Sequence, residues 1–182
     1  MALTIQDVEK LQLLYPEHKI ELRGGEITIV SPSDITSGLI AGRLLTRLNL
    51  WIEPRRLGFV FDSSSGFRPA EGELTAPGVA YISRRRLPRV PRSYGQIVPD
   101  LVVEVKSSTD RVKLIEDKLV HYLEVGAQVG ILVDPDEQTV SIYRPNQAPV
   151  VLAGEAILSL PELLPGWQLP IAELWIVEFG DE

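Results

Sequence analysis

The spacing of apolar residues changes within the first 31 residues of the chain, from a helical pattern to an alternating one. Each pattern predicts a different secondary-structure element. Residues 4–16 have the spacing of a short helix, with Thr4 as the N-cap and an acid three residues later. Residues 19–31 alternate apolar and polar positions on both sides of Gly24 and Gly25, which is typical of a hairpin. The chain is therefore expected to open with a helix followed by a two-stranded ribbon.

The next run, residues 31–53, returns to helical spacing. Its apolar side chains recur from Leu39 to Trp51, and a proline follows the end of the run. Short strand-like runs then appear within residues 57–69 and at residues 78–83. This part of the chain predicts a long helix followed by strands.

The second half of the chain begins with a strand-like run at residues 100–107 that leads into a helical run at residues 108–127. Ser108 or Thr109 is the expected cap of this helix. Two further strand-like runs flank the turn around Pro135, and the tail is expected to hold a strand or two and a short closing helix.

The order of these elements predicts the fold class. A strand, a helix and a strand within residues 101–133 favour a crossover inside a mixed sheet. We therefore expect an α/β fold with a largely antiparallel front part. The length of 182 residues suits one domain over residues 1–182.

One strand carries charges where a buried strand should be apolar. Within VPDLVVEVKSSTD, residues 98–110, Glu104 and Lys106 occupy alternate positions and share one face, roughly 7 Å apart along the strand. A carboxylate there can hold a hard cation such as Mg²⁺, and an ammonium can neutralise charge on a phosphoryl group. A structural ion pair at the sheet edge is the alternative explanation.

Composition narrows the range of functions. There is no cysteine, so thiolate chemistry and disulfides are excluded. The chain has no apolar run long enough to span a membrane and no signal-peptide pattern, so a cytoplasmic protein is expected. The net charge of −7 argues against a general nucleic-acid coat protein, although local basic patches can still bind phosphate.

Several segments together resemble a known family. PDLVVEVKSSTDR, LIEDKLVHYLEVGAQVGILVDP, TVSIYRP, FVFDSSSGFRP and GVAYISRRRLP are similar, in order and spacing, to the bacterial putative restriction endonuclease domain family. That family, long described as a domain of unknown function, belongs to the Asp–Glu-X-Lys nuclease superfamily. The resemblance covers most of residues 10–175. It implies a restriction-endonuclease-like mixed sheet flanked by helices and a Mg²⁺-dependent site that hydrolyses DNA.

The resemblance also assigns roles to residues. Glu104 matches the second metal-binding acid of the family, and Lys106 matches the catalytic lysine. The first metal-binding aspartate of the family usually follows a proline, and here that position is Gly78. Because one ligand is missing, we expect Mg²⁺ to bind weakly and cleavage to be impaired.

Other acids in the sequence are candidates to replace the missing ligand. Asp100 lies four residues from Glu104 on the same strand, roughly 13 Å away, so it is expected to cap the strand or to pair with a base instead. Asp62, Glu71 and Glu73 are the alternative ligands that a neighbouring strand offers.

Basic residues outside the strand suggest contacts to DNA. Residues 84–92 hold five arginines, among them Arg84, Arg85 and Arg86, and Lys118 lies one helical turn before Tyr122. A solvated loop and an ordinary surface lysine are the alternative interpretations.

Two accounts of function remain open at this stage. The first is a Mg²⁺-dependent endonuclease acting on DNA. The second is a catalytically degenerate protein of the same fold that serves as a DNA-binding or homodimeric scaffold. A homodimer is expected in either account, because two-fold dimers are the commonest assemblies and suit a duplex.

Overall fold

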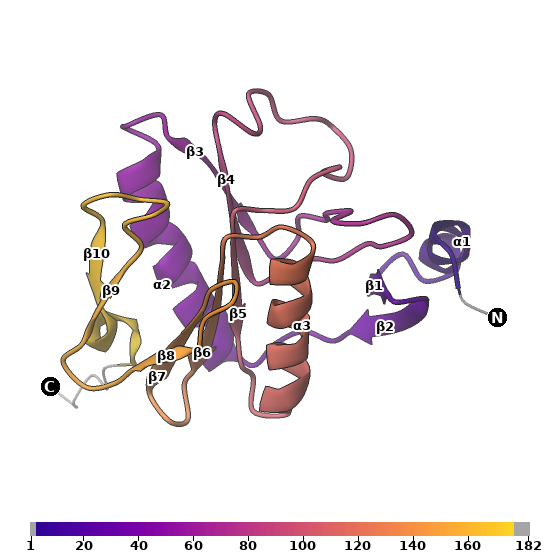
Figure 1. Ribbon diagram of the computed structural model, residues 1–182. Helices are drawn as coiled ribbons and strands as arrows, with labels where there is room; N and C mark the ends of the chain where they lie inside the picture. The colour runs from indigo at the N-terminus through magenta and orange to yellow at the C-terminus, as the bar shows by residue number, and fades with distance from the viewer. Residues whose placement is uncertain (1–2, 177–182) are drawn as a thin grey trace, which may run out of the picture.

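The computed structural model describes residues 3–176. A mixed sheet forms its centre, and two helices lie on opposite sides of that sheet (Figure 1). The helical elements are α1 (Ile5–Leu14), α2 (Ile35–Ile52), α3 (Val112–Glu124) and the 3₁₀ turn η1 (Ile171–Leu174). The strands are β1 (Lys19–Arg23), β2 (Glu26–Val30), β3 (Gly58–Asp62), β4 (Val79–Ser83), β5 (Leu101–Val105), β6 (Val129–Asp134), β7 (Thr139–Tyr143), β8 (Val150–Leu152), β9 (Ile157–Ser159) and β10 (Gln168–Pro170).

The six-stranded sheet has the order β3-β4-β5-β6-β7-β8. The pair β5 and β6 is parallel and is connected through α3, whereas the other neighbours are antiparallel. The expected α/β fold with a crossover in a mixed sheet is therefore confirmed. The hairpin β1-β2 stands apart from this sheet and carries α1 (Figure 1).

Alternation along the central strands distributes side chains to two cores. Val103 and Ile131 face α2 and join the larger core, to which η1 and β10 also contribute. Val102 and Leu132 face the other way and pack with Leu119 of α3. Because both faces are covered, the middle strands are almost uniformly apolar. The exceptions are Glu104 near the end of β5 and Asp134 at the end of β6.

The start of α3 differs from the sequence prediction. The helix begins after Arg111, whose side chain makes no cap, rather than after Ser108 or Thr109. The reason is a local turn in which the backbone N–H of Ser107 donates to a carboxylate oxygen of Asp110 at 2.8 Å. Asp34, the N-cap of α2, also accepts from the backbone N–H of Ser108 at 2.9 Å, so this segment is held outside the helix.

Candidate active site

Glu104 is the penultimate residue of β5. Side chains alternate across a strand, so Glu104 faces the same way as Val102, toward α3. Only 15% of its side chain is exposed. A carboxylate in this position requires a partner, because burying an unpaired charge is costly.

That partner is Lys118, which projects from the facing helix. Its Nζ lies 3.0 Å from Oε1 of Glu104 and 3.0 Å from the carboxylate of Glu21 in β1. The contact with Glu104 is an ion pair by distance, and Oε1 accepts no hydrogen bond from the described residues. One ammonium therefore bridges two largely buried carboxylates from two separate strands.

Hydrogen bonds connect the hairpin β1-β2 to residues 74–76, the segment that precedes Gly78. The carboxylate of Glu21 accepts the backbone N–H of Ala76 at 2.8 Å, and Nζ of Lys19 donates to the carbonyl of the same residue at 3.0 Å. Leu22 exchanges backbone hydrogen bonds with Leu74 at 2.7 and 2.9 Å. Glu21 is thus held by its own backbone pairing as well as by Lys118.

The electrostatics follow from burial. Burial raises the pKa of Glu104, the nearby charge of Glu21 raises it further, and the ammonium of Lys118 opposes both effects. Burial alone would lower the pKa of Lys118, but the carboxylates of Glu104 and Glu21 outweigh it and hold that pKa above its usual range. Burial lowers the pKa of Lys19. Lys118 is therefore charged at neutral pH, and it stabilises the charged form of Glu104.

Lys106 lies on the same face as Glu104 but binds other groups. Its ammonium contacts the carboxylate of Asp136 and lies 3.7 Å from an oxygen of Asp134 at the end of β6. The hydrogen bond to Asp136 is the main reason that its pKa is raised. Of the two lysines, Lys118 is the one in contact with Glu104, and the catalytic role of Lys106 stays a prediction.

Gly78 lies beside Glu104, immediately before β4. A Cβ atom added at Gly78 would lie 3.1 Å from the carbonyl oxygen of Val103, 3.7 Å from the backbone nitrogen of Val105 and 3.9 Å from the Cα of Glu104. A side chain at this position would therefore start against the backbone of the Glu104 strand. The glycine leaves that place without a carboxylate.

The residues present do not make a complete magnesium site. Mg²⁺ prefers near-octahedral oxygen ligands at about 2.0–2.1 Å. Glu104 has an oxygen without a hydrogen bond, but Glu21 is the second carboxylate here and both acids share the ammonium of Lys118. Within residues 3–176 there is no group of three or more acids or histidines placed to hold a metal.

The other acids considered from the sequence have partners elsewhere. Asp62 accepts hydrogen bonds from Ser64 in the turn after β3. Glu73 pairs with Nε2 of His121 at 2.8 Å, and Glu71 is exposed. Within residues 3–176, none of these three carboxylates forms an ion pair or a hydrogen bond with Glu104 or Lys118.

Asp100 pairs with a base, as the sequence predicts. It is fully buried and accepts from the backbone N–H of Ser83 at 2.7 Å, from Arg86 at 2.8 Å and from Gln128 at 2.6 Å. Burial alone would raise the pKa of Asp100, but these donors lower it overall. Arg86 is therefore anchored at the base of its loop, whereas Arg84 and Arg85 are exposed.

Glu21 and Lys19 were not identified from the sequence. The signal available was their alternation in KIELR, which places both on one face of β1. Alternation alone does not reveal that this face meets Lys118, 97 residues further along the chain.

Comparison with known proteins places the fold in a class. A crystal structure of a putative nuclease belonging to DUF820 from Anabaena variabilis ATCC 29413 is similar, with a TM-score of 0.82 and 26% sequence identity, covering 95% of this chain and 97% of that one. The architecture is that of a nuclease-like α/β protein, which confirms the expected fold class.

The family model described as "Putative restriction endonuclease" matches residues 5–172. The chain belongs to this family, and the resemblance found in the sequence is confirmed. No curated protein matches the sequence. No helix in the described part of the chain is both long and apolar enough to cross a membrane.

Proposed function

We propose that this protein acts on DNA as a Mg²⁺-dependent endonuclease whose cleavage is impaired. Membership of the restriction endonuclease family supports DNA as the substrate and a phosphodiester bond as the target. The proposal that cleavage is impaired rests on the glycine at position 78, next to the backbone of Glu104. A nuclease site that lacks one acid loses charge that would hold the cation.

The proposed roles follow from the contacts. Glu104 is the acid that contributes to cation binding, and Glu21 is the nearest second carboxylate. Lys118 is better placed than Lys106 to neutralise a phosphate near Glu104, because its ammonium already lies 3.0 Å from that carboxylate. The bridge through Lys118 competes with a cation for both acids, which is a second reason to expect weak Mg²⁺ binding.

Nicking of supercoiled DNA in Mg²⁺ and in Mn²⁺ tests this function. Slow nicking that requires a divalent cation and disappears in Glu104→Ala is the expected result for an impaired enzyme. Rapid cleavage that requires Glu104 would contradict the impairment, and nicking that survives the substitution would contradict the assignment of the site.

The second candidate function is a catalytically degenerate protein that binds DNA or forms a homodimeric scaffold. The ammonium of Lys118 between two carboxylates favours it, because this arrangement is stable without a metal. DNA retention without any nicking, together with a dimeric mass by light scattering, is the expected result for this candidate. A monomer that retains no DNA would exclude it.

A further inference from the structure

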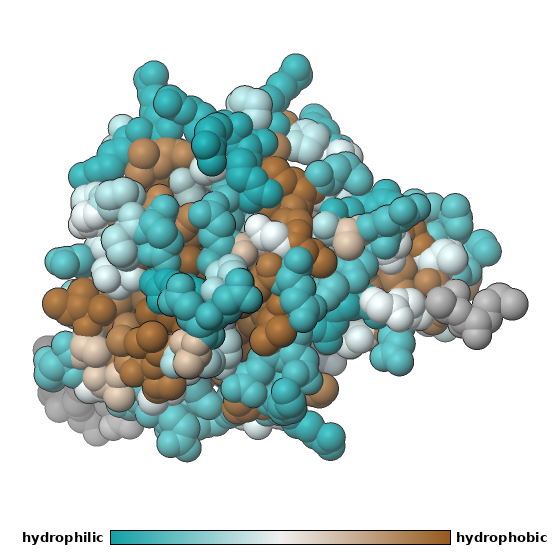
Figure 2. All heavy atoms as spheres, viewed as in Figure 1, coloured by the Kyte–Doolittle hydropathy of each residue, from teal (hydrophilic) through white to brown (hydrophobic). Residues whose placement is uncertain are grey.

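One end of the molecule carries a concentration of arginine. Five arginines at this end are exposed and make neither an ion pair nor a cation–π contact among the described residues: Arg56, Arg84, Arg85, Arg89 and Arg92. We call this set the arginine end. It occupies the top of the molecule in Figure 1, where the turn after α2 and the long loop after β4 meet, and Figure 2 shows hydrophilic residues over this region.

The fold brings two separate segments together here. Gly58 of β3 pairs with Ser83 of β4, and the backbone N–H of Arg84 donates to the carbonyl of Leu57 at 2.8 Å. The turn that contains Arg56 therefore lies next to the start of the arginine loop. Arg55, in the same turn, stacks on Trp51 with 3.6 Å between its guanidinium carbon and the ring centroid.

A buried acid supports the base of the loop. Asp100 bonds both to the backbone of Ser83 and to the guanidinium of Arg86, so the loop leaves the sheet from a fixed point. Arg86 uses its charge in this anchor. The five guanidinium groups of the arginine end remain available to a ligand.

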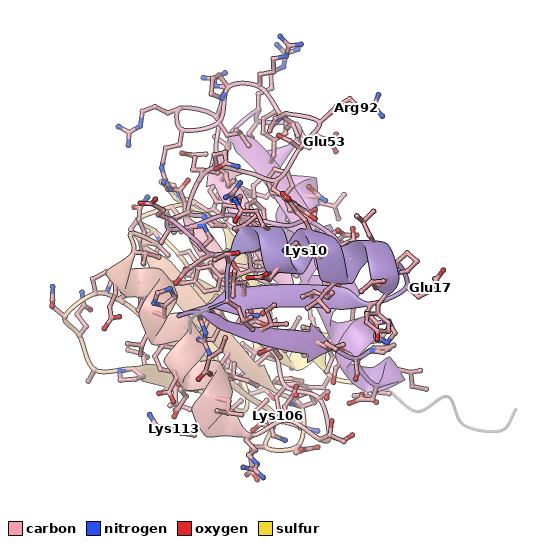
Figure 3. The ribbon with its side chains drawn as sticks, turned by 90° about the vertical axis from the view of Figure 1, so that its right-hand side faces the viewer. Lys10, Glu17, Glu53, Arg92, Lys106 and Lys113 are labelled. Atoms are coloured by element: carbon pink, nitrogen blue, oxygen red, sulfur yellow. The ribbon has the colours of Figure 1, made fainter. Side chains whose placement is uncertain are left out.

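The arginine end is positively charged, whereas the chain as a whole has a negative net charge. Residues 54–61 and 84–99 hold seven of the 18 basic residues and no acid, so eleven bases remain elsewhere against 25 acids. Glu53, Asp62 and Asp100 directly flank these two segments in the sequence, and Figure 3 shows Glu53 at the same end of the molecule as Arg92. Because salt screens charges over about 8–10 Å, a ligand at this end experiences mainly the arginines.

The arginine end lies away from the candidate active site. Figure 3 shows Arg92 and Lys106 at opposite ends of the molecule. Asp100, which anchors the arginine loop, and Glu104 are four residues apart along β5 and its start, roughly 13 Å at ~3.3 Å per residue. One phosphate group therefore cannot touch the exposed arginines and Glu104 of the same chain.

We propose that the arginine end is a second, separate surface that binds the phosphate backbone of nucleic acid. Guanidinium groups bind phosphate through two parallel hydrogen bonds, and the cluster holds several of them on one loop and an adjoining turn. The inference rests on the proposed function for the identity of the ligand. It does not depend on cleavage, on a metal or on Glu104.

An anionic membrane is the other polyanion that such a surface meets. The arginines stand on a proline-punctuated loop rather than along an amphipathic helix, which disfavours insertion into a bilayer. Tyr94, 42% exposed on the same loop, adds an aromatic face of the kind that stacks on bases.

Binding of a fluorescent 20-base-pair duplex by the full chain, measured across a salt series, tests the proposal. The variant Arg84→Gln/Arg85→Gln/Arg92→Gln removes three exposed charges. The control Lys10→Gln/Arg111→Gln/Lys113→Gln removes three exposed charges elsewhere and reaches the same net charge. All three proteins are measured without divalent cations, so that cation binding at the candidate active site does not contribute.

We expect the arginine variant to bind at least about tenfold more weakly, with a salt slope lower by about 3, because roughly 0.9 is lost per phosphate contact on duplex DNA. The control with three charges removed elsewhere is expected to bind like the wild-type protein. Equal weakening in the arginine variant and the control would overturn the proposal. So would binding of the wild-type protein to vesicles of anionic lipid but not to the duplex.

Failure of the arginine surface and failure of the proposed nuclease function give different experimental results. Nicking by wild-type protein tests Glu104 and the cation, whereas duplex binding in the absence of divalent cations tests the arginines. A protein that cleaves normally after loss of the three arginines, with unchanged affinity, would contradict the arginine surface and leave the nuclease assignment intact.

Discussion

The ammonium of Lys118 lies 3.0 Å from the carboxylate of Glu104, although the two residues belong to different elements, α3 and β5. The same ammonium lies 3.0 Å from Glu21 of β1. This contact joins the ribbon, the central sheet and the helix at the site that we propose contributes to cation binding. The network has both a stabilising role and a consequence for cation binding.

Removal of Lys118 is expected to destabilise the protein strongly. Lys118→Met leaves two largely buried carboxylates without their shared partner, and breaking a buried pair in this way costs about 3–5 kcal/mol. Urea denaturation measures this change in the free energy of unfolding. Lys113→Met is the matched control on the same helix, because it removes an exposed pair with Asp117 and is expected to cost below about 1 kcal/mol. Similar losses in both variants would show that the bridge contributes little.

Neutralising Glu104 is expected to be tolerated. Glu104→Gln keeps the shape of the side chain, and Lys118 retains Glu21 as a partner, so the free energy of unfolding at pH 7 should change by about 1 kcal/mol or less. The pH dependence has a defined sign. Burial raises the pKa of Glu104, so its charged form is disfavoured in the folded state, and its contribution to stability falls as pH rises above about 4.3.

Stability curves of wild type and Glu104→Gln between pH 4 and pH 8 test that sign. The variant should lack the decrease that Glu104 contributes as pH rises. A variant that instead loses stability progressively toward pH 8, relative to wild type, would mean that Glu104 is stabilised as a carboxylate by more than burial costs it.

Asp100 is expected to contribute to the loss of stability of the folded protein at low pH. Its pKa is lowered overall by the donors around it, so its contribution is present above about pH 3.9 and is lost as pH falls through the lowered value. Asp100→Asn is expected to cost about 2–4 kcal/mol at pH 7, because Arg86 loses its buried partner. The cost should shrink below pH 4, and a cost independent of pH would contradict the charged anchor.

Much of the fold was predictable from local patterns. The alternation around Gly24 and Gly25 predicts the β1-β2 hairpin, and the spacing from Leu39 to Trp51 predicts α2. Glu104 was identifiable as a candidate because a charge inside the VVEV run is unusual for a covered strand. Gly78 was identifiable only through the resemblance to the family, because the spacing of apolar and polar residues does not mark this position.

The partners of Glu104 were harder to predict. Lys106 is the nearest lysine on the same face, so strand geometry favours it, but Asp134 and Asp136 compete for its ammonium. Lys118 meets Glu104 only because α3 packs on the sheet through Leu119 and Tyr122. Such contacts depend on tertiary packing, which a local pattern does not specify.

Calorimetric titration with Mn²⁺ of wild-type protein and of Gly78→Asp tests the central claim most directly. Gly78→Asn is the matched control, since it adds a side chain of the same size against the carbonyl of Val103 without a carboxylate. We expect wild type and Gly78→Asn to give no saturable heat up to millimolar Mn²⁺, and Gly78→Asp to bind with an affinity at least tenfold greater and to lose it in the Glu104→Gln background. Tight, saturable binding of Mn²⁺ by the wild-type protein that is lost in Glu104→Gln would contradict the account.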